Sequence, residues 1–229
     1  DVMGEVGKTY NILSDRGIQM NATFNPWKGQ EDATIMSDVG ILLGQDEIQF
    51  GVGQELTING ETITGDEPVM LRNGEVSRDG KNIVIKTNEY QITLQDAGEY
   101  LNYDFQISAE GAAADGVTPH GLWGQSVDGD GQARSGDQGK GAQGGGAIET
   151  VDENGQIVMS QQGDRTVHTY YEVDNLFSTN GIRAGSEDFF RYGDQGGPGM
   201  DGFGAGQGGG ANGEFEDPEL QAMGGRQPM

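Results

Sequence analysis

Apolar and polar residues alternate in short runs over residues 1–110 of the chain. In 82–86 and 90–94 an apolar side chain returns at every second position, which is the period of a strand with one buried face. Asn59-Gly60 lies between two such runs and is a strong signal for a two-residue hairpin turn. We predict strands at 8–13, 17–24, 34–43, 46–52, 55–58, 61–64, 69–72, 82–87, 90–95 and 100–108.

This strand pattern predicts an all-β fold. Each strand with its turn takes about 8–12 residues, a spacing typical of sandwiches and barrels. Two further strands are predicted at 156–160 and 166–173, where Tyr170 and Tyr171 should return aromatic side chains to the core. We therefore predict an antiparallel β-sandwich or barrel-like module over residues 1–192.

Two segments depart from the strand pattern. Residues 111–147 are rich in Gly, Asp, Ala and Gln, and predict a long acidic Gly-rich loop; loops of this length are usually functional or disordered. Leu122 and Trp123 are the large apolar residues of this loop, so we expect them to be buried anchors. Residues 193–229 form a Gly-rich C-terminal tail with too few apolar residues to fold alone.

The charge of the chain excludes two classes of partner. The 229 residues include 13 basic and 37 acidic side chains, for a formal net charge of -24. Nucleic-acid binding needs a basic surface, and so does docking on an anionic membrane. No run approaches the roughly 20 apolar residues of a membrane-spanning helix, so membrane insertion is not expected.

The residue types present also limit the chemistry. The chain has no Cys and two His, which excludes disulfides, thiolate zinc sites and multi-histidine metal centres. It starts at Asp1 without an apolar leader, which favours an exported and processed protein at an extracellular or cell-surface location. A start chosen for recombinant expression is the alternative interpretation.

One acidic stretch has the spacing of a calcium-binding loop. Ser126, Asp128, Asp130 and Asp137 stand at positions 1, 3, 5 and 12, and Gly131 stands at position 6. Alternating acidic residues on a Gly-rich turn can converge the oxygen ligands that Ca²⁺ requires. We therefore predict a calcium site here, with a solvated acidic turn as the alternative.

Catalytic chemistry finds little support in the sequence. His120, Ser126 and Asp128 are close along the chain, but a triad also needs an oxyanion hole and a strained nucleophile turn, and no such motif is present. We expect His120 to have a structural role in the loop. The chain is therefore predicted not to be an enzyme.

Two segments together resemble the von Willebrand factor type D family in its cysteine-poor form. Residues 4–15 read G-E-V-G-K-T-Y-N-I-L-S-D, and 18–24 follow as a strand ending in N-A-T-F. Residues 119–125 read P-H-G-L-W-G-Q and precede Asp128 and Asp130. These are similar to the opening phrase and to the calcium-loop phrase of the family, and the resemblance covers roughly residues 1–192.

The resemblance implies a function and adds one residue to the metal site. Gln125 stands where animal members have Asn, so the implied calcium ligands are Gln125, Ser126, Asp128, Asp130 and Asp137. The family's upstream Asp-Pro-His phrase and its disulfides are missing from this chain. The family implies an extracellular β-rich module that serves in adhesion, matrix or polymer assembly, without catalysis.

These observations lead to two hypotheses for function. The first is a structural subunit of an extracellular filament, sheath or matrix, stabilised by calcium and built from copies of the same chain. Gly-rich segments can approach a neighbouring backbone closely, so the tail should lie against another subunit. The alternative is a monomeric calcium-dependent adhesion or ligand-binding module of a cell-surface protein.

Overall fold

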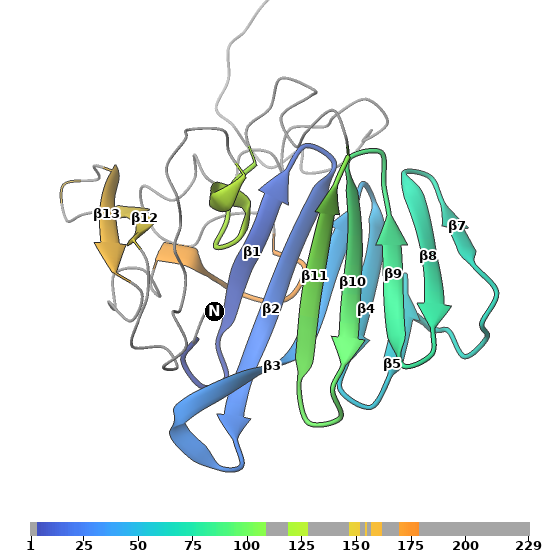
Figure 1. The fold of residues 1–229 in the computed structure, drawn as a ribbon, viewed down its shortest axis with the longest axis horizontal. Helices are drawn as coiled ribbons and strands as arrows, with labels where there is room; N and C mark the ends of the chain where they lie inside the picture. Colours follow the sequence, from blue (N-terminus) through green and yellow to red (C-terminus); the bar gives the residue numbers. More distant parts are fainter. Residues whose placement is uncertain are drawn as a thin grey trace, which may run out of the picture.

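The computed structural model describes residues 4–108, 119–127, 147–151, 154, 157–161 and 170–178. Within them the protein is all-β, and its strands pair antiparallel in two large sheets and one hairpin (Figure 1). The first sheet has the strand order β14-β1-β2-β3-β4-β5-β6, and the second has the order β11-β10-β9-β8-β7. The predicted antiparallel β-sandwich is therefore confirmed.

The strands have the following bounds. The first sheet contains β1 (Thr9–Asp15), β2 (Ile18–Trp27), β3 (Gln30–Leu43), β4 (Asp46–Gly51), β5 (Glu55–Ile58), β6 (Glu61–Thr62) and β14 (Glu172–Val173). The second contains β7 (Val69–Leu71), β8 (Gly74–Asp79), β9 (Asn82–Lys86), β10 (Tyr90–Asp96) and β11 (Leu101–Ile107). The hairpin is β12 (Ala147–Val151) with β13 (Ile157–Gln161), and a short 3₁₀ helix, η1, spans Gly124–Ser126.

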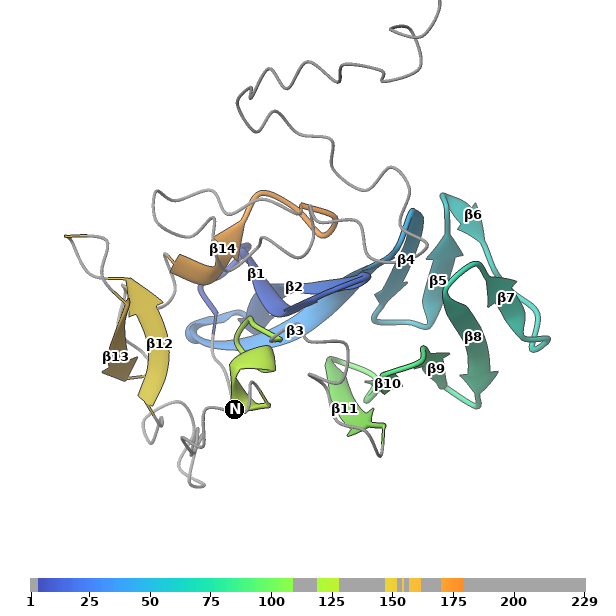
Figure 2. The same ribbon diagram turned by 90° about the horizontal axis from the view of Figure 1, so that it is seen from above.

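Both large sheets are meanders, and one late strand pairs with the first strand of the chain. From β1 to β6, and again from β7 to β11, each strand pairs with the next one along the chain. Seen from above, β1–β3 face β10 and β11 across the interior (Figure 2). Much later in the chain, β14 returns to pair with β1, through Thr9↔Val173 and Tyr10↔Glu172.

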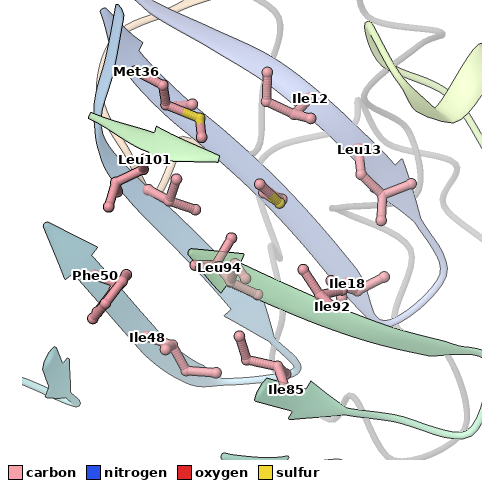
Figure 3. Close-up of a cluster of buried hydrophobic side chains, with 14 of the residues drawn as sticks. Ile12, Leu13, Ile18, Met36, Ile48, Phe50, Ile85, Ile92, Leu94 and Leu101 are labelled. Carbon is pink, nitrogen blue, oxygen red and sulfur yellow. The ribbon is translucent and has the colours of Figure 1, made fainter. Parts of the chain in front are cut away.

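The core lies between the two sheets and follows the predicted alternation. In β9 and β10 every second residue is buried, and Ile83, Ile85, Ile92 and Leu94 are all fully excluded from solvent. Phe50 from β4 enters the same layer from the opposite sheet (Figure 3). Burial of such side chains contributes about 1.5–3 kcal/mol each, so this apolar layer is the main source of stability.

The predicted Asn59-Gly60 turn is confirmed. Both residues have a positive φ, 52° and 80°, which a two-residue turn between twisted antiparallel strands requires. The Asn59 side chain also accepts a hydrogen bond from the Glu47 backbone N–H at 2.9 Å and donates to Asp46 at 2.9 Å. The turn is thus fixed to the neighbouring β3–β4 connection.

Several strands differ from the sequence prediction: β2 continues to Trp27 instead of ending at residue 24, β6 ends at Thr62 instead of residue 64, and three further strands differ more. The sequence does not predict β8, because its residues, G-E-V-S-R-D, are mostly polar and only Val76 of this strand is buried. β12 also has no separate prediction. β3 begins at Gln30 instead of residue 34, since the β2–β3 hairpin continues beyond the apolar stretch that marks the strand in the sequence.

The prediction of a strand over 166–173 is wrong in part. Of this range the structure describes residues 170–173, where Tyr170 and Tyr171 adopt a helical conformation and Glu172–Val173 is a strand. Both tyrosines are buried, with their rings 4.9 Å apart edge to face. Consecutive residues of a strand point to opposite faces, so a helical turn is what allows two adjacent rings to enter the interior. Their predicted return to the core is confirmed.

Candidate functional site: a buried amide face

The outer face of β2 is polar although solvent does not reach it. Strand alternation turns Met20 and Ala22 toward the apolar core, and therefore turns Gln19 and Asn21 outward. These outward side chains are 1% and 0% exposed. Together with Asn11 of the neighbouring strand, which is also fully buried, they form what we call the amide face.

Residues 170–178, the cover segment, lie over the amide face. In Figure 2 this segment is on the side of β1 and β2 that faces away from the second sheet. The Asn21 side-chain amide donates to the backbone carbonyls of Leu176 at 3.1 Å and Ser178 at 3.0 Å. The Gln19 amide donates to the same Ser178 carbonyl. The face thus binds the main chain of the cover segment.

Close approach of the cover segment depends on a glycine in β3. Gly40 pairs with Asn21, and a Cβ at this position would lie 2.6 Å from both the Cβ and the carbonyl oxygen of Leu176. That separation is far below van der Waals contact. The absence of a side chain at Gly40 therefore allows Leu176 to lie directly against β3.

Asn11, the member of the amide face that lies in β1, bonds both to β2 and within its own strand. Its Nδ2 donates to Asn21 Oδ1 at 3.0 Å and to the Leu13 carbonyl at 3.1 Å. Three buried oxygens in this region accept no hydrogen bond within the described residues: Asn11 Oδ1, Ser14 Oγ and Gln19 Oε1. A buried unpaired polar group costs about 1–3 kcal/mol, so these atoms favour any donor that reaches them.

A second segment, residues 119–127, completes the edge of β1 and is called the edge segment. His120 and Ser14 exchange two backbone hydrogen bonds, of 2.8 and 2.6 Å, and the Trp123 N–H donates to the Ile12 carbonyl at 2.8 Å. Gly121 has a φ of 109° and passes so close to Ile12 that a Cβ would lie 2.6 Å from its carbonyl oxygen. Only glycine fits this crossing.

The predicted anchors of this segment lie on the core. Leu122 is buried, and Trp123 packs against the core while keeping part of its surface exposed. The indole stacks on Phe105 at 3.8 Å and meets Tyr90 edge to face at 6.2 Å. Leu122 is thus confirmed as a buried anchor, whereas the prediction for Trp123 is met only in part, because this side chain is partly buried where it packs between β1 and β11.

A polar cluster joins the edge segment to the cover segment. Gln125 Nε2 donates to the Tyr171 hydroxyl at 2.8 Å and to the Gly121 carbonyl at 3.1 Å. The same hydroxyl lies 3.4 Å from His120 Nε2. All three side chains are buried, so His120 sits in the packing of the loop, as a structural role requires.

The structure describes part of the predicted calcium loop. Gln125 and Ser126 lie in η1, and the Ser126 hydroxyl donates to the Trp123 carbonyl at 2.6 Å. Asp128, Asp130 and Asp137 lie outside the described residues, as do the tail 193–229 and most of the loop 111–147. Among the residues that are described, no group of three acidic or histidine side chains is placed to hold a metal.

Burial also changes the ionisation of one tyrosine in β1. Desolvation raises the pKa of Tyr10 from 10.0 to about 12, and the nearby Glu5 and Glu172 carboxylates act in the same direction. The Glu5 backbone N–H donates to the hydroxyl at 3.1 Å and acts in the opposite direction. The neutral form of Tyr10 is therefore the one that the folded protein favours.

Sequence reasoning missed the amide face. Asn11, Gln19 and Asn21 occupy polar positions of alternating strands, which are ordinarily assigned to solvent. The available signal was their chemical type, because all three are amides and none of them carries a charge.

Comparison with known proteins leaves this chain without an assigned family. It matches no protein-family model, and no curated protein matches it in sequence. The likeness to von Willebrand type D domains therefore stays a prediction based on the two motifs. Across the described residues, no helix is both long and apolar enough to cross a membrane.

Proposed function

We propose that this protein is a structural subunit of an extracellular assembly such as a filament, sheath or matrix, and that copies of the chain are its partners. The observation that carries the proposal is the way β1 is completed. Two short pieces from later in the chain fill its edge, and the amide face binds one of them through main-chain carbonyls. Strand edges and faces that accept short extended segments are a common means of joining subunits.

The charge of the chain adds a role for calcium to this proposal. A formal net charge of -24 makes like copies repel, and divalent cations would reduce that repulsion. Val127 packs against the core directly before Asp128, so the acidic loop starts from a fixed point on the sandwich. The residues that would hold calcium are Gln125, Ser126, Asp128, Asp130 and Asp137.

Electron microscopy of the purified full chain, with calcium and with chelator, tests the proposal. We expect ordered fibres or sheets in calcium and fewer of them in chelator. The matched variant Asp128→Asn should behave in calcium as the wild type does in chelator. Dispersed single particles under every condition would contradict the proposal and favour the alternative, a monomeric calcium-dependent adhesion module.

A further inference from the structure

We propose that copies of this chain are joined by exchange of the cover segment, so that residues 170–178 of one copy lie on the amide face of the next. The inference rests on the proposed function and names the surface through which the subunits would be joined. Both the donated segment and the face that receives it are described in a single chain, where they already fit each other.

The amide face contacts the main chain of the cover segment. The amides of Gln19 and Asn21 bind backbone carbonyls of the cover segment, at Leu176 and Ser178. These carbonyls belong to a turn, which the Ser178 N–H closes by donating to the Asn175 carbonyl at 3.2 Å, so the amide face binds the main chain of a turn. An identical segment from a second copy makes the same hydrogen bonds with the same geometry.

Side-chain contacts make the surface selective for this particular segment. Leu176 lies against Gly40, and any side chain at position 40 would overlap with this leucine. The Tyr171 ring packs in the cluster of Gln125 and His120. Lys8 Nζ also pairs with Glu172 Oε1 at 2.6 Å. Unrelated peptides lack this combination of a leucine, a buried tyrosine and a carboxylate, so the occupant is the chain's own segment.

The strand pairing that holds the segment is short. β14 has two residues, and its ladder with β1 has two residue pairs. The other contacts are side-chain hydrogen bonds, a partly exposed ion pair, one leucine, and the buried rings of Tyr170 and Tyr171. Since intramolecular and intermolecular contacts are the same, exchange is controlled mainly by effective concentration, as in domain swapping.

Single-cysteine variants of the full chain test the exchange, because the natural chain has no Cys. Thr9 and Val173 are directly paired, at a separation that a disulfide can span. Thr9→Cys chains are mixed with Val173→Cys chains under assembling conditions and then oxidised. The control mixture uses Thr57→Cys and Thr62→Cys, which are paired within the β5–β6 hairpin of one chain.

Exchange predicts a disulfide-linked heterodimer of the Thr9→Cys and Val173→Cys chains, at a yield about tenfold or more above the control mixture. The double variant Thr9→Cys/Val173→Cys should give cross-linked ladders in the assembled fraction. Internal disulfides alone in that variant, with heterodimer at the control yield, would overturn the exchange. If the double variant does not oxidise, Tyr10→Cys with Glu172→Cys replaces the pair, and the same two outcomes decide.

Microscopy of the same mixtures separates this inference from the proposed function. Fibres that form without heterodimer would leave the proposed function in place and overturn the exchange. Heterodimer without fibres would support the exchange and contradict the assembly that we propose.

Discussion

Two regions of this protein exclude water by different means. Between the sheets, Phe50, Ile83 and Ile92 pack in an apolar layer. On the outer face of β1 and β2, Asn11 and Asn21 are just as completely buried, Asn21 beneath the cover segment and Asn11 beside Gly121 of the edge segment. The first region is closed by the hydrophobic effect, and the second by hydrogen bonds between amides and main-chain carbonyls.

The difference separates stability from specificity. Apolar burial is non-directional and scales with area, so many arrangements of similar volume would serve. A buried amide is stable only where a donor or acceptor meets it, so the amide face tolerates few positions of the cover segment. We therefore expect the apolar layer to determine the free energy of unfolding, and the amide face to determine what binds there.

The largest expected effect is the loss of an aromatic ring from the apolar layer. Phe50→Ala should lower the free energy of unfolding by about 3–5 kcal/mol, because the ring is fully buried and the cavity cannot collapse completely. Urea denaturation measures it. Met70→Ala, at a side chain that is 71% exposed, is the control and should change stability by about 0.5 kcal/mol or less. If Phe50→Ala costs less than the amide substitution described next, the contrast between the regions fails.

The amide face should respond more weakly but still measurably. Asn21→Ala removes the donor to the Leu176 and Ser178 carbonyls and should cost about 2–3 kcal/mol. Asn25→Ala is the matched control, because Asn25 lies on the same face of β2 and donates one hydrogen bond, to the Ser37 hydroxyl at 2.8 Å, but is exposed. Equal losses for the two asparagines in thermal melts would mean that burial beneath the cover segment contributes nothing.

Alkaline pH should weaken the structure near β1. Because the pKa of Tyr10 is raised from 10.0 to about 12 on folding, folding favours the neutral phenol. The corresponding stability is complete below pH 10 and is lost as the pH rises toward 12, by about 2–3 kcal/mol. Denaturation at several pH values measures this loss, and Tyr10→Phe should reduce the slope. An unchanged slope in that variant would assign the alkaline loss to other groups.

A methyl group under the cover segment is expected to have the smallest of these effects. Gly40→Ala should destabilise the protein by about 1–3 kcal/mol, because the new Cβ would overlap with Leu176. Gly65→Ala is the control, since no atom lies within 4 Å of the Cβ added there. If both variants unfold at the wild-type urea concentration, the cover segment does not rest on β3 as described.

The sequence predicted the apolar region well, and the reason is periodicity. In β9 and β10 the side chains that alternate in the sequence are the ones that alternate between core and surface. The Asn59-Gly60 turn was equally clear, because few residue pairs adopt two successive positive φ values. A local sequence pattern is sufficient to predict burial wherever the alternation of a strand alone determines which of its side chains face the core.

The amide face could not be predicted in the same way. Gln19 and Asn21 are polar residues at outward positions, and their burial depends on Leu176 and Ser178, which are far away in the chain. Tyr170 and Tyr171 show the same limitation, since the sequence predicts a strand where a helical turn buries both rings. Of the predicted calcium ligands, Asp128, Asp130 and Asp137 lie outside the described residues and stay a prediction.

Amide hydrogen exchange on the full chain tests most directly the claim that the two regions are held by different interactions. We predict that amides of residues 170–178 exchange through a local opening, while those of β9 and β10 exchange only by global unfolding. Asn21→Ala should speed exchange in the cover segment more than in β10. A single opening free energy for both regions, changed equally by Asn21→Ala, would contradict the account.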